Sequence, residues 1–120
     1  MFVRSKQSAP TRSRQGMTTH VLLQLGDVAK TDLAVTWVDV EPGGAQGKHS
    51  HEPEQVYVIV AGTGRMHVGG ETRDVGVGDL VHVPSGVDHF IVNVGDDTLG
   101  YVSVATPTFS QTAFYDEGNL

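Results

Sequence analysis

The sequence predicts an all-β domain, from its valine content, its glycine content and the spacing of its apolar runs. Valine occurs 19 times, against seven leucines and seven alanines. Branching at Cβ restricts a side chain in a helix but packs well on a pleated sheet, so this balance favours strands. Fifteen glycines in 120 residues exceed the usual share of about 7%. Glycines also separate the Val-rich runs, as expected for tight turns between strands.

Eight short apolar runs, bounded by Gly, Pro or Asp, are the expected strands. The run at 64–68 alternates apolar and polar residues, so one face is expected to be buried and the other solvated. The run at 56–60 is apolar on both faces, which is typical of a central strand. Eight such strands predict a sandwich or a closed barrel. They are expected at 20–25, 33–40, 55–61, 64–68, 71–75, 79–83, 89–94 and 99–105.

The chain length fits one domain with a terminal segment at each end. We expect a disordered basic tail at 1–17, a barrel domain at 18–108, and a C-terminal tail or strap at 109–120. Residues 1–16 carry four basic side chains and no acid, whereas the rest of the chain has a net charge of −10. An acidic domain repels phosphate backbones, so no nucleic-acid partner is expected.

The composition also excludes several classes of protein. Without cysteine, disulfides, thiolate metal sites and cysteine nucleophiles are impossible. No apolar run approaches the roughly 18 residues of a membrane helix, and the N-terminus lacks the apolar stretch of a secretory signal. We therefore expect a cytoplasmic protein with no membrane partner.

Two histidines lie two residues apart in the sequence His49-Ser50-His51. On an extended segment both side chains project to the same face, with Cβ atoms about 7 Å apart. Both rings can then reach one ion at about 2.0–2.1 Å. Gln55 shares that face if the strand is regular. Because Pro53 interrupts the strand, Glu54 is the alternative ligand if a bulge shifts the register by one residue.

Two longer patterns contain these residues and a third histidine. Residues 43–62 read G-x5-H-x-H-x3-Q-x6-G, which resembles the first cupin motif, G-x5-H-x-H-x3,4-E-x6-G, with Gln in place of Glu. Residues 78–93 read G-x5-P-x-G-x2-H-x3-N, which resembles the second cupin motif at every defined position. The two motifs stand in the family's order, separated by 15 residues.

The resemblance implies a cupin jelly-roll β-barrel that holds one divalent transition metal ion (Zn, Ni, Fe, Mn or Cu). Carried over residue by residue, the implied metal ligands are His49, His51, Gln55 and His89. Asn93, the last motif residue, is expected to hold a turn rather than to touch the metal. The departure from the family pattern is Gln55, because a neutral amide leaves the full +2 charge of the ion uncompensated. Compared with a site that has Glu at this position, we expect the ion to be a stronger Lewis acid and to capture an anionic or enolate-forming substrate better. We also expect the site to retain the metal more weakly.

Three further residues are weaker candidates for the site. Tyr57 lies on the ligand-bearing face of its strand, where it is either an acid–base group or a core aromatic residue. His82 is a candidate general base, with a structural or exposed histidine as the favoured alternative. Trp37 is expected in the core or in a dimer interface rather than in the substrate pocket.

The cupin resemblance does not fix the function, since cupins include dioxygenases, isomerases, cyclases, storage proteins and sugar sensors. We expect a metal-dependent enzyme that acts on a small oxygen-rich or enolisable substrate, by dioxygenase-, isomerase- or cyclase-like chemistry. The alternatives are a non-catalytic module that binds a small molecule and a structural barrel with a vestigial metal. A homodimer is also expected, paired through the short apolar run 20–25, which would be an exposed edge strand.

Overall fold

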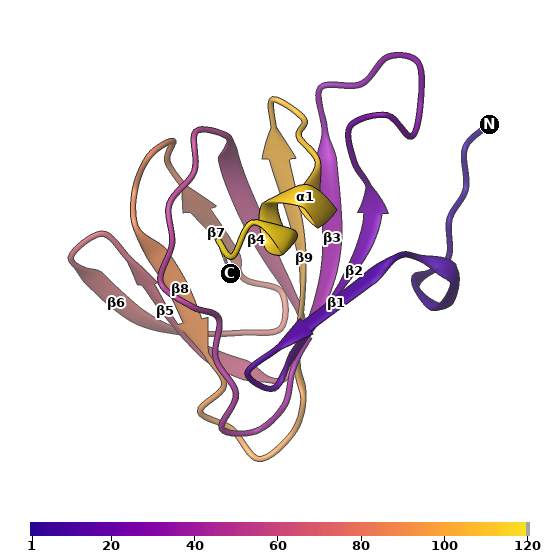
Figure 1. The fold of residues 1–120 in the computed structure, drawn as a ribbon. Coiled ribbons are helices and arrows are strands. Elements are labelled where there is room, and N and C mark those ends of the chain that lie inside the picture. The colour runs from indigo at the N-terminus through magenta and orange to yellow at the C-terminus, as the bar shows by residue number, and fades with distance from the viewer. Residues whose placement is uncertain (120) are drawn as a thin grey trace.

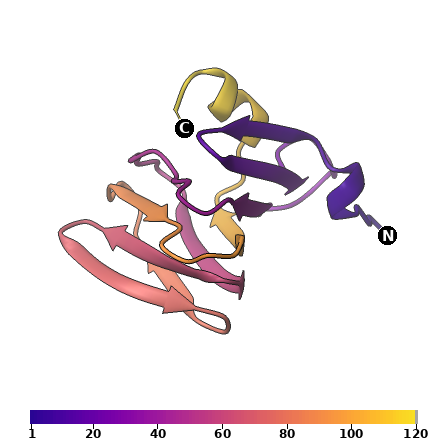
Figure 2. The same cartoon turned by 90° about the horizontal axis from the view of Figure 1, so that it is seen from below.

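The computed structural model describes residues 1–119, which form two antiparallel sheets and two short helical segments. The six-stranded sheet has the order β1-β2-β3-β9-β4-β7, and the three-stranded sheet has the order β6-β5-β8. The sheets form two layers with the core between them (Figures 1 and 2). The strands are β1 (Thr11–Arg14), β2 (Met17–Leu23), β3 (Ala34–Val40), β4 (Glu54–Ala61), β5 (Thr63–Val68), β6 (Glu71–Gly76), β7 (Leu80–Val83), β8 (His89–Val92) and β9 (Leu99–Thr106).

The predicted all-β barrel is confirmed, and the eight expected strands correspond to β2 through β9. Alternation places the side chains: along β3, every second residue is buried and the residues between them are half-buried. The buried set of each strand faces the other sheet, because successive side chains point to opposite faces. The core consists of Met17, Val38, Val40, Tyr57, Ile59, Met66, Val75, Val83, Ile91, Leu99, Tyr101 and Tyr115.

The N-terminal segment differs from the disordered tail expected for residues 1–17. Lys6–Ser8 form a 3-10 helix, η1, and β1 pairs with β2 along its whole length. Gln15 and Gly16 both have positive φ, which is the two-residue turn that suits a β-hairpin. The segment lacks apolar periodicity, but backbone pairing does not require it. β1 pairs with residues 17–20 of β2, and the Pro10 carbonyl accepts a hydrogen bond from the Val21 backbone N–H at 2.8 Å. The N-terminal segment therefore covers the start of the run 20–25 that was expected as an edge strand.

The C-terminal segment after β9 forms one short helix, α1 (Gln111–Asp116). Ser110 caps its N-terminus by accepting a hydrogen bond from the Ala113 backbone N–H at 3.3 Å. The helix lies across the space between the two sheets (Figure 1). Six residues are too few for a helical apolar pattern to be recognised in the sequence. Within residues 1–119, neither helical segment is long and apolar enough to span a membrane.

Candidate metal centre

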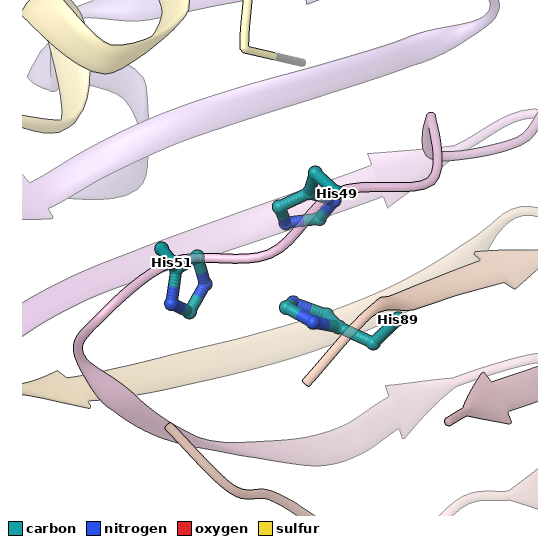
Figure 3. Close-up of side chains that lie close together, drawn as sticks. All are labelled: His49, His51 and His89. Atoms are coloured by element: carbon teal, nitrogen blue, oxygen red, sulfur yellow. The ribbon is translucent and has the colours of Figure 1, made fainter. Parts of the chain in front are cut away.

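Three histidines from two neighbouring segments converge at one end of the barrel (Figure 3). His49 and His51 lie between β3 and β4, and His89 is the first residue of β8. The backbones of His49 and His89 exchange two hydrogen bonds, at 3.1 and 2.9 Å. This bridge places the segment beside β8. The ligand atoms of the three histidines lie within 4.8 Å of one another, so one ion can contact all three rings.

Each of the three rings is oriented by a backbone carbonyl two residues away. His49 Nδ1 lies 2.7 Å from the Gly47 oxygen, His51 Nδ1 lies 2.8 Å from the Pro53 oxygen, and His89 Nδ1 lies 2.9 Å from the Val87 oxygen. A carbonyl only accepts, so in neutral His49 and His89 Nδ1 carries the proton and Nε2 keeps its lone pair. For these two rings the backbone selects the tautomer that binds a metal through Nε2. In His51 both ring nitrogens face an oxygen, because Nε2 lies 3.0 Å from Gln55 Oε1.

Burial favours the neutral form of His49 and His89. Desolvation lowers the pKa of His49 to about 3, with further lowering by the nearby His89 and His51. Desolvation also lowers the pKa of His89. A metal therefore does not have to displace protons from these two nitrogens near neutral pH.

His89 provides the test of whether the residues fit a metal ion. The residue is 1% exposed, and its Nε2 atom is buried without a hydrogen-bond partner among the described residues. A buried nitrogen lone pair that faces two other imidazoles is costly unless something accepts its electrons. Three imidazole donors suit a divalent transition ion rather than Mg²⁺ or Ca²⁺. The residues present therefore fit the metal that the motifs imply.

The structure separates Gln55 from the alternative ligand Glu54. Gln55 is 8% exposed and faces inward, with Oε1 3.0 Å from His51 Nε2. Its amide nitrogen donates to Ser103 Oγ at 2.6 Å. Glu54 is exposed on the outer face of β4, where it pairs with His82. The regular register of β4 therefore brings Gln55, and not Glu54, to the histidines.

Tyr57 lines the same pocket, but its hydroxyl is already bonded. The residue is fully buried, and its hydroxyl lies 2.9 Å from Gln46 Nε2 and 3.1 Å from Gln46 Oε1. Its ring stacks on Tyr101 at 4.5 Å between centroids. Burial raises the pKa of Tyr57 well above its ordinary value. The hydroxyl thus keeps its proton, and Tyr57 serves the pocket as a neutral hydrogen-bonding group.

The structure does not bring His82 or Trp37 into this pocket. His82 lies on the outer face of β7, and its Nε2 contacts Glu54 Oε1 at 2.7 Å. Trp37 is half-buried on the outer face of β3, where its indole nitrogen donates to Asp39 Oδ1 at 3.1 Å. Both residues occupy the outward phase of their strands, opposite the histidines.

Several pocket residues have no motif in the sequence to reveal them. Ser103 belongs to the inward phase of β9, so strand alternation alone could have placed it. Gln111 and Phe114 come from α1, which has no recognisable helical pattern in the sequence. The pocket lining contains no carboxylate, lysine or arginine. The lining residues are Thr19, Thr36, Val38, Gln46, His49, His51, Gln55, Tyr57, Tyr101, Ser103, Gln111 and Phe114.

Comparison with known proteins agrees with this geometry. Residues 36–105 match the model of the Cupin domain family. An oxalate-binding protein of Thermotoga maritima is 36% identical over 64 residues, which make up 52% of this chain and 53% of that protein. The match thus spans about half the length of this curated relative.

Two solved structures share the fold at lower identity. A predicted oxalate decarboxylase from Thermotoga maritima superposes with a TM-score of 0.78 at 22% identity, over 89% of this chain and 99% of that one. The polyketide cyclase RemF from Streptomyces resistomycificus superposes with a TM-score of 0.75 at 23% identity, over 88% and 79% of the two chains. At these identities the likeness concerns the fold alone.

Proposed function

The chain belongs to the cupin domain family, and from this premise we propose that it is a metal-dependent enzyme for a small oxygen-rich or enolisable substrate. The observation that carries the proposal is the shared orientation of three imidazoles, whose Nδ1 atoms are all held by carbonyls. Gln55 is the fourth ligand in this proposal. Its amide is positioned by Ser103, which leaves Oε1 directed at the histidine cluster.

A bound divalent ion would act as a Lewis acid toward a substrate carbonyl, enol or carboxylate. The residues of the chain would bind the ion and orient the substrate. The three histidines and Gln55 contribute no negative charge, so the site attracts a ligand that brings its own anionic oxygen. Tyr57, held by Gln46, offers a protonated hydroxyl, and the aromatic side chain of Phe114 shields the site from water.

The names of similar proteins support this class of ligand without specifying one. Oxalate and polyketides, the ligand or product classes named for two of them, both carry several oxygen atoms that can chelate a metal.

A non-catalytic binding module is the second candidate, and one observation favours it. The pocket lining contains no carboxylate and no histidine besides the three that converge. His82, the candidate general base, lies outside the pocket. A reaction that needs a separate protein base would therefore find none among the described lining residues.

Metal loading separates the two candidates. We would load the apoprotein with Fe²⁺, Ni²⁺, Zn²⁺ or Mn²⁺ and screen enolisable dicarbonyls and thiols, with and without oxygen. Turnover that requires metal and is lost in His89→Ala supports the enzyme. Tight ligand binding without turnover under any metal supports the binding module. Failure to bind any of these ions would contradict both.

A further inference from the structure

A cleft separate from the metal pocket lies between strands β6 and β7. Each of these strands is the last of its sheet, and both lie on the side of the barrel away from β1 (Figure 1). The cleft has a volume of about 360 Å³ and shares no lining residue with the metal pocket. Pockets that bind small molecules begin at about 300 Å³, so this cleft is large enough for one.

The floor of this cleft is apolar and consists of Met66, Val68, Val75 and Val81. Met66 and Val75 are 3% and 8% exposed and belong to the hydrophobic core, whereas Val68 and Val81 are partly buried against that core. An apolar group in the cleft would remove the remaining surface of Val68 and Val81 from water, which is favourable. The cleft is therefore suited to a ligand with an apolar part.

Two oppositely charged side chains, Glu71 and Arg73, project into the cleft from β6. Residues that lie directly opposite each other in paired strands share a face of the sheet. Glu71 pairs with Val68, and Arg73 pairs with Met66. Since Val68 and Met66 belong to the apolar floor, Glu71 and Arg73 point to the same side, and both line the cleft. Along β6, the inward face thus carries two exposed charges followed by the buried Val75.

Neither of these charges is used within the fold. The side chains of Glu71 and Arg73 make no ion pair and no hydrogen bond within residues 1–119. The outer face of the same two strands is different, because there Arg65 and Asp74 form an ion pair with two hydrogen bonds, at 2.8 and 3.4 Å. The two inward charges therefore remain available to a ligand.

The other ionisable side chains along the cleft have partners in the chain. Asp79 Oδ2 accepts a hydrogen bond from the Gly76 backbone N–H at 2.8 Å. His82 Nε2 lies 2.7 Å from Glu54 Oε1. One cation and one anion thus remain for a ligand, and a molecule that complements both is a zwitterion.

We propose that this cleft binds an α-amino acid with an apolar side chain. The carboxylate of the ligand pairs with Arg73, whose guanidinium offers it two parallel N–H donors. The ammonium group pairs with Glu71, and the side chain of the ligand covers the apolar floor. Glu71 and Arg73 lie about 7 Å apart at Cβ, as residues two apart on a strand do. The adjacent charged groups of an α-amino acid therefore fit between their flexible side chains.

Ligands with a single charge fit this cleft less well. An anion that reaches Arg73 also faces Glu71 on the same strand, and a cation that reaches Glu71 also faces Arg73. Like charges repel more strongly beside an apolar floor than in bulk water. A neutral apolar ligand would leave both side chains without a partner.

An NMR titration of the isotope-labelled, metal-free full chain with L-phenylalanine tests this site. The metal is left out because an α-amino acid can itself chelate an ion at the histidines. We expect the backbone amide signals of β6 and β7 to shift on addition of the ligand. The signals of His49 and His51 should not shift, and the same titration gives the Kd.

Substitutions on the two faces of β5 and β6 assign the charges. Arg73→Gln and Glu71→Gln should each raise the Kd for L-phenylalanine roughly fivefold to tenfold, because each removes a charge-assisted hydrogen bond. Arg65→Gln and Asp74→Asn remove the same charges from the outer face, so they are the matched controls and should keep the wild-type Kd. All four residues are exposed, so the variants should fold.

Changes in the ligand test the same contacts from the other side. N-acetyl-L-phenylalanine lacks the ammonium group, so it should bind more weakly than L-phenylalanine and be insensitive to Glu71→Gln. L-phenylalaninamide lacks the carboxylate, so it should bind more weakly and be insensitive to Arg73→Gln. Glycine, which cannot cover the apolar floor, should also bind more weakly.

Three results would overturn the inference. They are the absence of any shift at about 10 mM L-phenylalanine, shifts confined to the metal pocket, and equal Kd values in Arg73→Gln and Arg65→Gln. None of them bears on the metal, so failure here leaves the proposed function untouched. Failure of the chain to bind any metal ion would likewise leave this cleft untouched, because the two sites share no lining residue.

Discussion

Gln55 donates its side-chain amide to Ser103 Oγ over 2.6 Å, and this bond turns the carbonyl oxygen of Gln55 toward His51. The two residues come from neighbouring strands, β4 and β9, which pair along their length. A residue on β9 thus holds the amide nitrogen, while the carbonyl oxygen of the same amide faces the histidines.

Ser103→Ala should weaken both the fold and the metal site. The buried amide nitrogen of Gln55 loses its acceptor, which should lower the free energy of unfolding of the apoprotein by about 1–2 kcal/mol. The freed amide can also rotate, and loss of a group that orients a ligand typically lowers metal affinity about tenfold or more. Urea unfolding and competitive Ni²⁺ titration measure the two effects. Ser13→Ala on the exposed strand β1 is the control, and equal metal affinity in both variants would contradict the prediction.

Gln55→Glu should keep the fold and change the choice of metal. The carboxylate lowers the net charge of the site by one unit and adds a harder oxygen ligand. The ratio of the affinity for Mn²⁺ or Fe²⁺ to the affinity for Ni²⁺ should therefore rise by about tenfold or more. Competition with a chelating dye measures these affinities.

Glu54→Gln is the matched control, since it makes the reverse change one residue away on the outer face of β4. It should leave every metal affinity unchanged. Unchanged metal selectivity in Gln55→Glu would show that Gln55 is not a ligand.

The sequence predicted most of the barrel because its signals are local. Alternation and turn residues located eight of the nine strands in the described chain, and the motif residue Asn93 does hold a turn. Its amide bonds the carbonyls of Val40 and Asp97, both at 2.8 Å. The spacing of His49 and His51 likewise placed both rings on one side, and His89 joins them through the bridge to β8.

The parts that could not be predicted depend on contacts between distant segments. Strand β1 carries no apolar pattern and is defined by its backbone pairing with β2. Helix α1 is fixed by Thr19 and Arg12, about a hundred residues away in the chain. Its inward residue Gln111 therefore enters the pocket through tertiary packing alone. The position of His82 outside the pocket follows from the phase of β7, which four residues of sequence do not determine.

Gly62→Ala should be among the most damaging single changes in the barrel. Gly62 has a φ of +71°, and an added Cβ would lie 2.5 Å from the Thr98 carbonyl oxygen. The left-handed conformation and the clash with backbone together should cost about 3 kcal/mol or more. Gly43 also has positive φ, but its added Cβ would meet no atom within 4 Å. Gly43→Ala should therefore cost only about 1–2 kcal/mol, and equal losses in chemical denaturation would contradict this account.

The N-terminal segment should contribute to stability in a pH-dependent way through Arg4 and Asp27, whose side chains meet at 2.7 Å. The hydrogen bond from Arg4 is the main cause of a lowered pKa at Asp27, with help from the Gln24 backbone N–H. A carboxyl group with a lower pKa in the folded state stabilises the fold where it is ionised. This stabilisation is complete above the unfolded pKa of about 4 and disappears as the pH falls through the folded value.

Arg4→Gln should thus lower the free energy of unfolding by about 0.5–1 kcal/mol at pH 7 and have no effect near pH 2. Urea unfolding of the apoprotein at both pH values measures the difference. Arg73→Gln is the control, because Arg73 is exposed on β6 and forms no ion pair within residues 1–119. It should be neutral at both pH values. An equal loss for Arg4→Gln at pH 2 and pH 7 would mean that Arg4 acts by packing, since a protonated Asp27 no longer attracts its charge.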